Sequence, residues 1–420
     1  MVQFWRAARG NFGLPVGQAC GIVRLPKLTA LAFGRVIGYL KSFERGPGSR
    51  WWRGWAKGEG MAIKETKEFS RGMRDVVAAE TTVSFVDGEN NKLYYQGYDV
   101  DDLAGRVCHD ETVYLIWNGD LPNVKQLREQ QRELVGEMRL PDGIIRLLRD
   151  IPSHAHPMVV LRSLVSAMGM VDPEAEDNSL EANLRKRVRV TAWISTLIAA
   201  YYRVSRGLEL LEPDPEEQKA MDLLLMLHTD HGMNASTFAA RVTASTLADI
   251  YSATASALAT LKGPLHGGAN QHVMEMLEDI EHPERVDEFI DTLLDQKKRI
   301  MGFGHAVYKG EDPRAKHLRT ASEALCQRAD QARFYEMSHR IETLVREKKG
   351  IFPNVDFYSA SVQHALGIPK EFFTTVFAAS RVAGWTAHVL EQYADNRLIR
   401  PTSKYMGLYG RKFVPLEERP

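Results

Sequence analysis

A glycine-rich turn leads directly into the start of a helix in the stretch Met301-Gly-Phe-Gly-His-Ala-Val-Tyr-Lys-Gly-Glu-Asp-Pro-Arg-Ala-Lys-His317. Gly302 and Gly304 allow positive φ and a close approach of the backbone to a ligand, and His305 follows them directly. Asp312-Pro-Arg314 is typical of a helix start, with Asp as the N-cap and Pro in the first turn. A cation in the first turn opposes the helix dipole, so Arg314 indicates a further partner, such as a bound anion. The alternative is a surface turn with one solvated histidine and one solvated arginine.

The composition is that of a globular protein. The chain has 420 residues, of which 44% are hydrophobic, enough for a packed core and two or three domain-sized units. The net charge of zero gives no overall field that would favour nucleic acid. Three widely spaced cysteines predict neither a disulfide framework nor a cysteine metal site, and they favour a reducing compartment. The sequence has no uninterrupted apolar run of the ~18 residues that a membrane span needs.

Residues 1–60 differ from the rest of the chain, because they hold ten Lys and Arg residues against two Glu. Arg35 interrupts the apolar segment 28–40, which argues against a secretory signal. An Arg-rich, acid-poor composition also fits an organellar transit segment. We favour a third interpretation, in which translation starts at Met61 and the basic extension 1–60 is not native. We therefore leave this extension out of the fold prediction.

Beyond Met61 the hydrophobic pattern is helical, with one exception. Residues 82–97 predict a β-hairpin, since two β-prone runs flank a Gly/Asn turn. Apolar residues recur at helical spacing over four longer segments, namely 101–118, 185–206, 285–300 and 325–349. The predicted fold class is therefore all-α, with short Gly/Pro loops between helices and one short hairpin.

Four breaks between the helices hold the candidate functional residues. In the first, His228 and His231 are three residues apart and would share a helix face. A zinc site is one interpretation, but the general-base Glu of the known helical zinc motifs is missing at its usual spacing. Ordinary histidines at a helix end are the structural alternative.

The second and third breaks each present one titratable side chain. His266 lies between Gly263-Pro264 and Gly267-Gly268, so its imidazole would project from bare backbone. Asn354 as an N-cap would place Asp356 in the first turn of a helix. A solvated loop histidine and an Asp favoured only by the helix dipole are the alternatives.

The fourth break lies near the C-terminus. Arg381 falls in an apolar helix, and a buried Arg requires an anionic partner. Arg400 follows in a loop and could reach another chain. With Arg314, these arginines have no sequence-local acidic partner, and guanidinium groups suit carboxylate ligands. Neutral histidines and one carboxylate suit proton transfer at a carbon next to a carbonyl. The sequence has neither a phosphate-binding GxxxxGK[ST] motif nor a dinucleotide-binding GxGxxG motif.

Three motifs in this order and spacing resemble the citrate synthase family, in particular its bacterial type, which includes 2-methylcitrate synthases. They are Gly263-Pro-Leu-His-Gly-Gly-Ala-Asn270, Gly302-Phe-Gly-His-Ala-Val-Tyr308 with Asp312-Pro-Arg314, and Asn354-Val-Asp-Phe-Tyr-Ser359. The resemblance extends from about Met61 to the C-terminus. It implies an all-helical homodimer whose large domain comprises 61–266 and 367–420 and whose small domain comprises 267–366. It also implies a cleft that closes on substrate, a cytoplasmic location and a role in the tricarboxylic acid cycle.

The same resemblance implies the roles of the site residues. His266 would stabilise the enol of acetyl-CoA, Asp356 would take the methyl proton, and His305 would polarise the ketone of oxaloacetate. The oxaloacetate carboxylates and the CoA phosphates would be held by other side chains: His231, Arg314, Arg381, Arg400 from the partner subunit, and, for the phosphates, Lys309. The resemblance implies no metal, no cofactor other than the CoA thioester substrate, no nucleic acid and no membrane.

One departure from the family pattern lies at 212–220, where the connection is shorter than the helical segment usual in the family. We expect it to alter the large domain or the dimer surface. The alternatives to a citrate synthase are a 2-methylcitrate synthase that uses propionyl-CoA, a non-catalytic ligand-binding relative, and a metal-dependent hydrolase that uses His228 and His231.

Overall fold

The computed structural model describes residues 70–73, 76–210, 221–403, 405–407, 410 and 413–418. The expectations for residues 1–60 and for the short connection at 212–220 therefore lie outside the described residues. Ala79–Pro401 form one compact unit. The described residues on either side of it belong to a second unit, which has two single-turn 3-10 helices, η1 (Arg71–Met73) and η5 (Leu416–Glu418).

The predicted hairpin is confirmed and has a short third strand. Strands β1 (Ser84–Asp87), β2 (Lys92–Tyr95) and β3 (Tyr98–Asp99) form an antiparallel sheet in the order β1-β2-β3. Phe85 on β1 lies opposite Tyr94 on β2. Leu93 and Tyr95 point to the buried face of the sheet, which packs on the helices.

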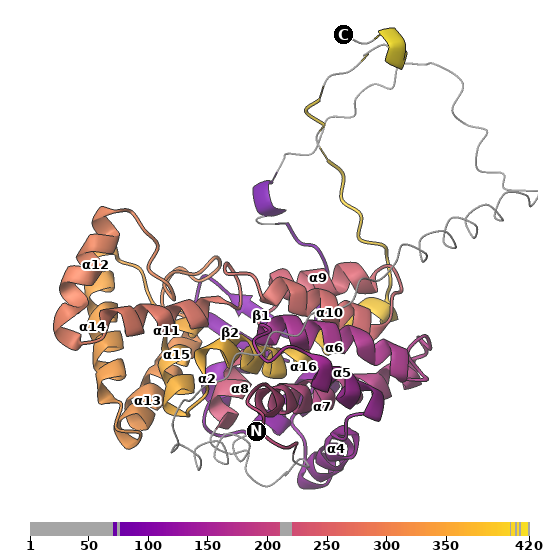
Figure 1. Ribbon diagram of the computed structural model, residues 1–420, viewed down its shortest axis with the longest axis horizontal. Coiled ribbons are helices and arrows are strands. Elements are labelled where there is room, and N and C mark those ends of the chain that lie inside the picture. The colour runs from indigo at the N-terminus through magenta and orange to yellow at the C-terminus, as the bar shows by residue number, and fades with distance from the viewer. Residues whose placement is uncertain are drawn as a thin grey trace, which may run out of the picture. The chain divides into compact units, whose positions relative to one another are not determined.

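The predicted all-α class is confirmed, since helices make up the rest of the compact unit (Figure 1). Ten α-helices come from two parts of the described chain: α2 (Val100–Leu103), α3 (His109–Asn118), α4 (Val124–Glu137), α5 (Asp142–Asp150), α6 (Pro157–Val171), α7 (Leu180–Ser205), α8 (Asp222–His228), α9 (Ala235–Ala244), α10 (Ile250–Leu261) and α16 (Phe373–Ala394). Five more lie between α10 and α16: α11 (Ala269–Ile280), α12 (Val286–Asp295), α13 (Pro313–Arg328), α14 (Ala332–Lys349) and α15 (Val355–Ala365). Two 3-10 turns, η3 (Pro283–Arg285) and η4 (Lys370–Phe372), precede α12 and α16.

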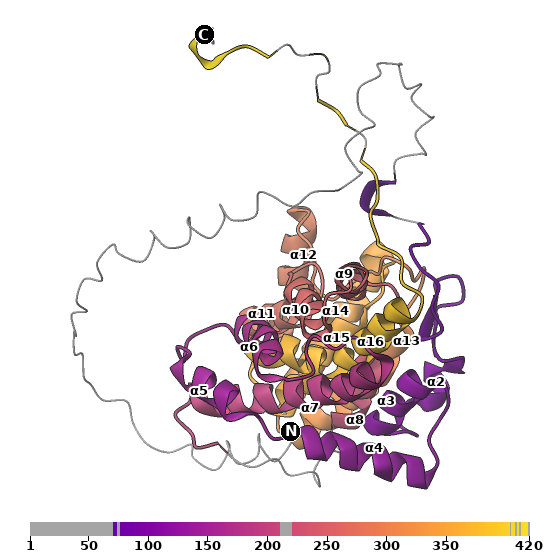
Figure 2. The same ribbon diagram turned by 90° about the vertical axis from the view of Figure 1, so that its right-hand side faces the viewer.

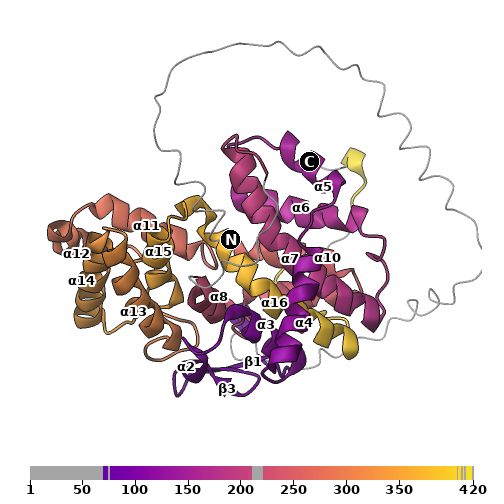
Figure 3. The same ribbon diagram turned by 90° about the horizontal axis from the view of Figure 1, so that it is seen from below.

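Helix α16 is buried along most of its length and packs against α3, α7, α8, α9 and α10 (Figure 2). Helices α11 to α15 gather on one side of the compact unit (Figure 3). One hydrophobic core joins both groups, and it includes Leu227, Val273, Phe357 and Trp385. The division into a large and a small domain stays a prediction. No described helix is both long enough and apolar enough to cross a membrane.

Three predicted helix bounds are wrong for one physical reason. The predicted helices 101–118, 285–300 and 325–349 are each interrupted or cut short, whereas 185–206 is confirmed within α7. Gly105, Lys297 and Asp330 have positive φ at these breaks. Positive φ ends the i to i−4 hydrogen-bond ladder of a helix. A glycine signals such a break in the sequence, but Lys297 and Asp330 do not.

Candidate active site

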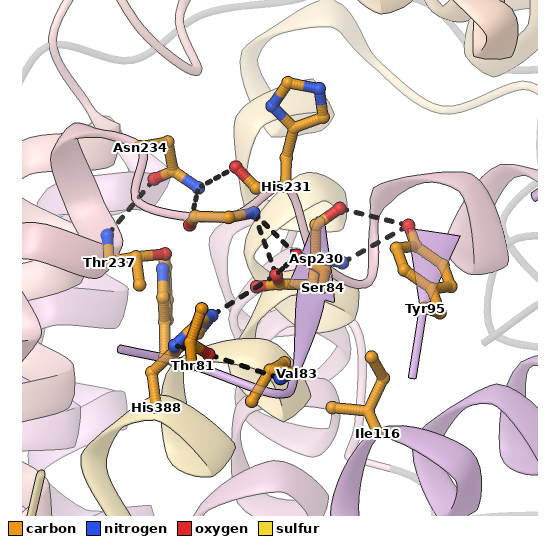
Figure 4. Close-up of polar contacts among 12 residues, drawn as sticks. Thr81, Val83, Ser84, Tyr95, Ile116, Asp230, His231, Asn234, Thr237 and His388 are labelled. Atoms are coloured by element: carbon orange, nitrogen blue, oxygen red, sulfur yellow. Dashed lines mark hydrogen bonds and ion pairs between the residues drawn. The ribbon is translucent and has the colours of Figure 1, made fainter. Parts of the chain in front are cut away.

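His231 lies in the turn between α8 and α9. Asn234 caps α9, because its side chain accepts hydrogen bonds from the backbone N–H groups of Ser236 and Thr237. Gly232 has φ of 56°, which turns the chain sharply after His231. The ring of His231 points away from the Asp230 carboxylate (Figure 4), and its Nε2 lies 3.0 Å from the hydroxyl of Tyr308. Burial and then the nearby Arg314 hold the pKa of His231 well below its ordinary value, so the ring is neutral.

His266 lies in the turn between α10 and α11. The backbone N–H of Ser236 donates to Nε2 of His266 at 3.3 Å, and the Ser236 hydroxyl lies 2.8 Å from the same atom. Burial, followed by the charge of Arg381, lowers the pKa of His266 to about 4. A neutral imidazole carries one N–H, and since Nε2 accepts, that proton is on Nδ1. His266 therefore offers a hydrogen-bond donor at Nδ1.

His305 has the opposite tautomer. The backbone N–H groups of Val307 and Tyr308 both donate to Nδ1 of His305 at 3.1 Å, so the proton of the neutral ring is on Nε2. Burial, followed by the charge of Arg314, lowers the pKa of His305 to about 4. The predicted positive φ is confirmed at Gly302, where a Cβ would lie 2.9 Å from Phe357. Glycine is thus required for the turn that presents His305.

Asp356 lies in the first turn of α15. The predicted N-cap is confirmed, because Asn354 accepts a hydrogen bond from the Asp356 backbone N–H at 3.0 Å. Asp356 Oδ1 is buried and has no hydrogen-bond partner among the residues that the structure describes. Burial raises the pKa of Asp356 to about 7, although Arg314 and Arg381 oppose this rise. A carboxyl group with a pKa near neutrality is suited to general acid–base chemistry.

These four side chains line one cavity. It has a volume of about 910 Å³, and its walls come from β1, the His231 turn, the His266 turn, residues 299–307 and the start of α15. His231, His266, His305 and Asp356 are far apart in the sequence, yet all four face this space. The rings of His231 and His305 are 5.0 Å apart at their centroids. The cavity thus combines a buried carboxyl group with two neutral imidazoles, one with its proton on Nδ1 and the other with its proton on Nε2.

Arg314 has an acidic partner that the sequence analysis did not assign. Its Nε and Nη2 donate to the two carboxylate oxygens of Asp312 at 2.9 and 2.7 Å. The prediction that Arg314 lacks a sequence-local acidic partner is therefore wrong. Asp312 caps α13 through its Oδ1, and the fork of Arg314 folds back onto the same carboxylate.

Arg381 is as deeply buried as the sequence predicts, but it makes no ion pair with a carboxylate of any described residue. Its Nε donates to the backbone oxygen of His228 at 2.7 Å, and its guanidinium lies over the ring of Phe377. Burial lowers the pKa of Arg381 to about 10, and the nearby Asp230 opposes this effect. Arg381 is thus a buried cation without a carboxylate partner among the described residues, an arrangement that favours a bound anion.

Comparison with known proteins identifies the family. A family model described as "Citrate synthase, C-terminal domain" matches residues 72–402. The chain is 45% identical over 370 residues to "Citrate synthase 2" of Bacillus subtilis (strain 168), covering 83% of this chain and 99% of that one. This chain belongs to the citrate synthase family. It is also 39% identical over 368 residues to the 2-methylcitrate synthase of Shewanella oneidensis, covering 83% and 97% of the two chains.

The structural comparison gives the same family. Citrate synthase of Thermoplasma acidophilum, in a ternary complex with carboxymethyl coenzyme A and oxaloacetate, superposes with a TM-score of 0.80 at 33% identity. The match covers 84% of this chain and 100% of that chain. The resemblance found in three motifs is therefore confirmed over most of the chain.

Five candidate residues of this citrate synthase family member are not among those that line the cavity, namely the buried Arg314 and Arg381 and also Lys309, Arg400 and His228. Lys309 is exposed and pairs with Glu89 next to the hairpin turn, at 2.6 Å. Arg400 is exposed. His228 turns away from His231, because its Nδ1 contacts the Leu224 backbone oxygen at 2.7 Å. No group of three or more potential metal ligands gathers in the described part of the chain, so the proposed zinc pair has no third ligand there.

Sequence reasoning missed several residues that orient the site. Ser236 orients His266, Tyr308 contacts His231, and Asp312 binds Arg314. Asp312 and Tyr308 lie within the quoted motif, so the motif was a signal for them. Ser236 follows the N-cap Asn234, but nothing in its local sequence indicates the contact with His266.

Proposed function

We propose that this chain is a citrate synthase that condenses acetyl-CoA with oxaloacetate and water to give citrate and CoA. The observation that carries the proposal is the set of three titratable groups on one cavity. A buried carboxylate without a hydrogen-bond partner on Oδ1 lies there with two neutral imidazoles whose donors are Nδ1 of His266 and Nε2 of His305.

In the proposed first step Asp356 takes a proton from the acetyl methyl group. The thioester methyl is a very weak acid, so the developing enolate oxygen needs a preorganised donor, and His266 Nδ1–H is suited to that role. Because the ring is neutral, the donor requires no protonation step before the reaction.

In the second step the enol carbon attacks the ketone carbon of oxaloacetate. A carbon–carbon bond forms as the ketone carbon–oxygen double bond becomes single, and His305 Nε2–H donates to the oxygen as it gains charge. The oxygen ends as a hydroxyl group, and the one proton it takes up balances the one that left the methyl group. The product is citryl-CoA. Water then adds to its thioester carbonyl, the carbon–sulfur bond breaks, and the CoA thiol leaves with a proton.

The oxaloacetate carboxylates would be held by His231, Arg314 and Arg381, with Arg400 contributed by the partner subunit of a homodimer. Arg381 is suited to bind an anion, because its guanidinium makes no ion pair with a carboxylate of the described chain. Lys309 is proposed to contact the CoA phosphates. Closure of the cleft would remove water and protect citryl-CoA.

A second candidate is 2-methylcitrate synthesis from propionyl-CoA. The 2-methylcitrate synthase of Shewanella oneidensis favours it, because this chain aligns with 97% of that relative. The chemistry is the same, since the proton leaves the carbon next to the thioester carbonyl in both substrates.

Oxaloacetate-dependent release of free thiol tests the proposal. We expect release with acetyl-CoA, and the rate with propionyl-CoA at equal concentration distinguishes the two candidates. Absence of thiol with both thioesters would reject both. Oxaloacetate binding without turnover would instead favour a non-catalytic relative. Full activity after removal of metal would exclude the hydrolase alternative.

A further inference from the structure

The turn that carries His231 is fixed from several directions. Arg381 and Ser380 on α16 donate to backbone oxygens at the end of α8. The Tyr95 hydroxyl on β2 donates to the backbone oxygen of Asp230 at 3.0 Å. A Cβ on Gly384 would lie 2.3 Å from Asp230 Oδ1, so only glycine lets α16 approach this turn.

The Asp230 carboxylate links the two residues that flank His231 in the chain, Asp230 itself and Gly232. Asp230 is fully buried, and its Oδ2 accepts a hydrogen bond from the backbone N–H of Gly232 at 2.9 Å. The Ser84 hydroxyl on β1 donates to the same oxygen (Figure 4). A carboxylate that accepts from the N–H two residues later closes an Asx-turn. The single residue inside this turn is His231.

A buried histidine completes the support of Asp230. His388 on α16 is fully buried, and its Nε2 lies 3.3 Å from Asp230 Oδ2 (Figure 4). Its Nδ1 lies 3.5 Å from Glu391, which pairs with Arg241 of α9 at 3.0 Å. Burial lowers the pKa of His388, but Asp230 and Glu391 outweigh burial and raise that pKa to about 8.

Side chains from four elements surround this imidazole. Thr81 precedes β1, Arg241 belongs to α9, Asp230 belongs to the His231 turn, and Glu391 lies one turn along α16. The Asp230 and Glu391 carboxylates are thus linked through one ring. The ring is fully buried and does not line the cavity, whereas Thr81, Ser84 and the His231 turn do.

We propose that Asp230 and His388 are positioning residues for oxaloacetate binding, and that they act through His231. The inference rests on the proposed function, in which His231 holds oxaloacetate. Neither side chain touches the substrate. Their pair fixes the Asx-turn, and the turn aims the imidazole of His231 at the cavity.

The test compares two substitutions of His388. His388→Leu removes the donor to Asp230, whereas His388→Gln keeps an amide N–H in nearly the same place. We expect the oxaloacetate Kd of His388→Leu, measured by calorimetry, to rise about tenfold or more, as loss of a charge-assisted hydrogen bond implies. The oxaloacetate Kd of His388→Gln should lie within about threefold of the wild-type value. The acetyl-CoA KM should be unchanged in both variants. A wild-type oxaloacetate Kd in folded His388→Leu would overturn the inference.

A double-mutant cycle shows whether the effect passes through His231. In a His231→Asn background, we expect His388→Leu to change the oxaloacetate Kd by less than about twofold, because coupled residues are non-additive. Additive effects would overturn the inference. His364→Leu, a half-buried histidine on α15 outside this network, is the matched control and should leave the Kd unchanged.

The two proposals fail in different ways. Wild-type protein that binds oxaloacetate but releases no thiol would reject the proposed reaction, while the Kd comparison would still decide the roles of Asp230 and His388. Wild-type protein that does not bind oxaloacetate at all would overturn both.

Discussion

The starts of helices α13 and α15 each place an aspartate near Arg314, and the two aspartates differ in their protonation. Burial would raise the pKa of Asp312, but the charge and hydrogen bonds of Arg314 outweigh it and hold that pKa below its ordinary value. The charge of Arg314 acts on Asp356 without a hydrogen bond between them, and burial raises the pKa of Asp356 to about 7. Asp312 Oδ2 also accepts from the Val355 backbone N–H, so the two helix starts are in contact.

The difference follows from which of the two carboxylates occupies the guanidinium of Arg314. Its bidentate fork is occupied by Asp312, whose two oxygens both receive N–H donors. The second carboxylate is left with the desolvation penalty and no compensating hydrogen bond on Oδ1. Asp312 is therefore an ion-pair partner, and Asp356 is available as a base.

The largest expected effect is a loss of catalysis on substitution of Asp356, which distinguishes it from Asp312. Asp356→Asn removes the proposed base, so thiol release should fall by roughly 10²–10⁴-fold, the usual contribution of a general base. Steady-state thiol release measures the loss, and calorimetry should find oxaloacetate binding largely intact. Equal loss of binding and turnover would contradict the assignment of Asp356 as the base.

Asp312→Asn should act on stability instead. It leaves the buried Arg314 without its counter-charge, so the free energy of unfolding should fall by about 3–5 kcal/mol. Urea unfolding at pH 8 measures the loss. The matched variant Arg314→Met/Asp312→Asn removes both charges and should recover part of it. A stability equal to the wild type in the single variant would show that the ion pair contributes nothing.

Arg381→Met extends the comparison to a guanidinium without a carboxylate partner. It loses one hydrogen bond to His228 and removes an uncompensated buried charge, so we expect unfolding free energy to change by less than about 1 kcal/mol. The oxaloacetate Kd should rise about tenfold or more. Destabilisation as large as that of Asp312→Asn would mean that Arg381 has a structural partner.

The pH dependence of the wild type follows from the raised pKa of Asp356. Its ordinary value is 3.8 and its folded value is about 7, so the folded protein binds more protons than the unfolded chain between these values. Stability therefore falls as pH rises through this window, and the loss is complete above it. In the proposed reaction the Asp356 carboxylate is the base, so kcat/KM should rise with pH through about 7.

Comparison of the wild type with Asp356→Asn isolates the contribution of Asp356 to the pH dependence of stability. The variant should be more stable than the wild type at pH 8, and the difference should vanish on acidification towards the ordinary pKa of Asp. Urea midpoints at several pH values measure the trend. A difference that does not depend on pH would show that Asp356 is not held with a raised pKa.

The smallest effect is expected at Lys309, whose ion pair with Glu89 is exposed. Exposed pairs contribute little to stability, so Lys309→Ala should leave the urea midpoint unchanged. If Lys309 contacts CoA phosphates, the acetyl-CoA KM should rise with the oxaloacetate KM unchanged. Lys125→Ala, a similarly exposed lysine on α4, is the control.

The sequence by itself determined what depends on neighbouring residues along the chain. The N-caps Asp312 and Asn354, the positive φ of Gly302 and the helical spacing of α7 follow from local sterics and local hydrogen bonds. The three motifs were also sufficient to predict the family, and of their residues His266, His305 and Asp356 line one cavity.

Tertiary structure decided the partners and the electrostatics. Local sequence does not reveal that Asp312 occupies the fork of Arg314, that Arg381 has no described carboxylate beside it, or that Asp356 is isolated. It also does not reveal the opposite tautomers of His266 and His305. The physical reason is that desolvation and ion pairing depend on which groups pack together in space, whereas capping and φ depend on atoms only a few bonds away.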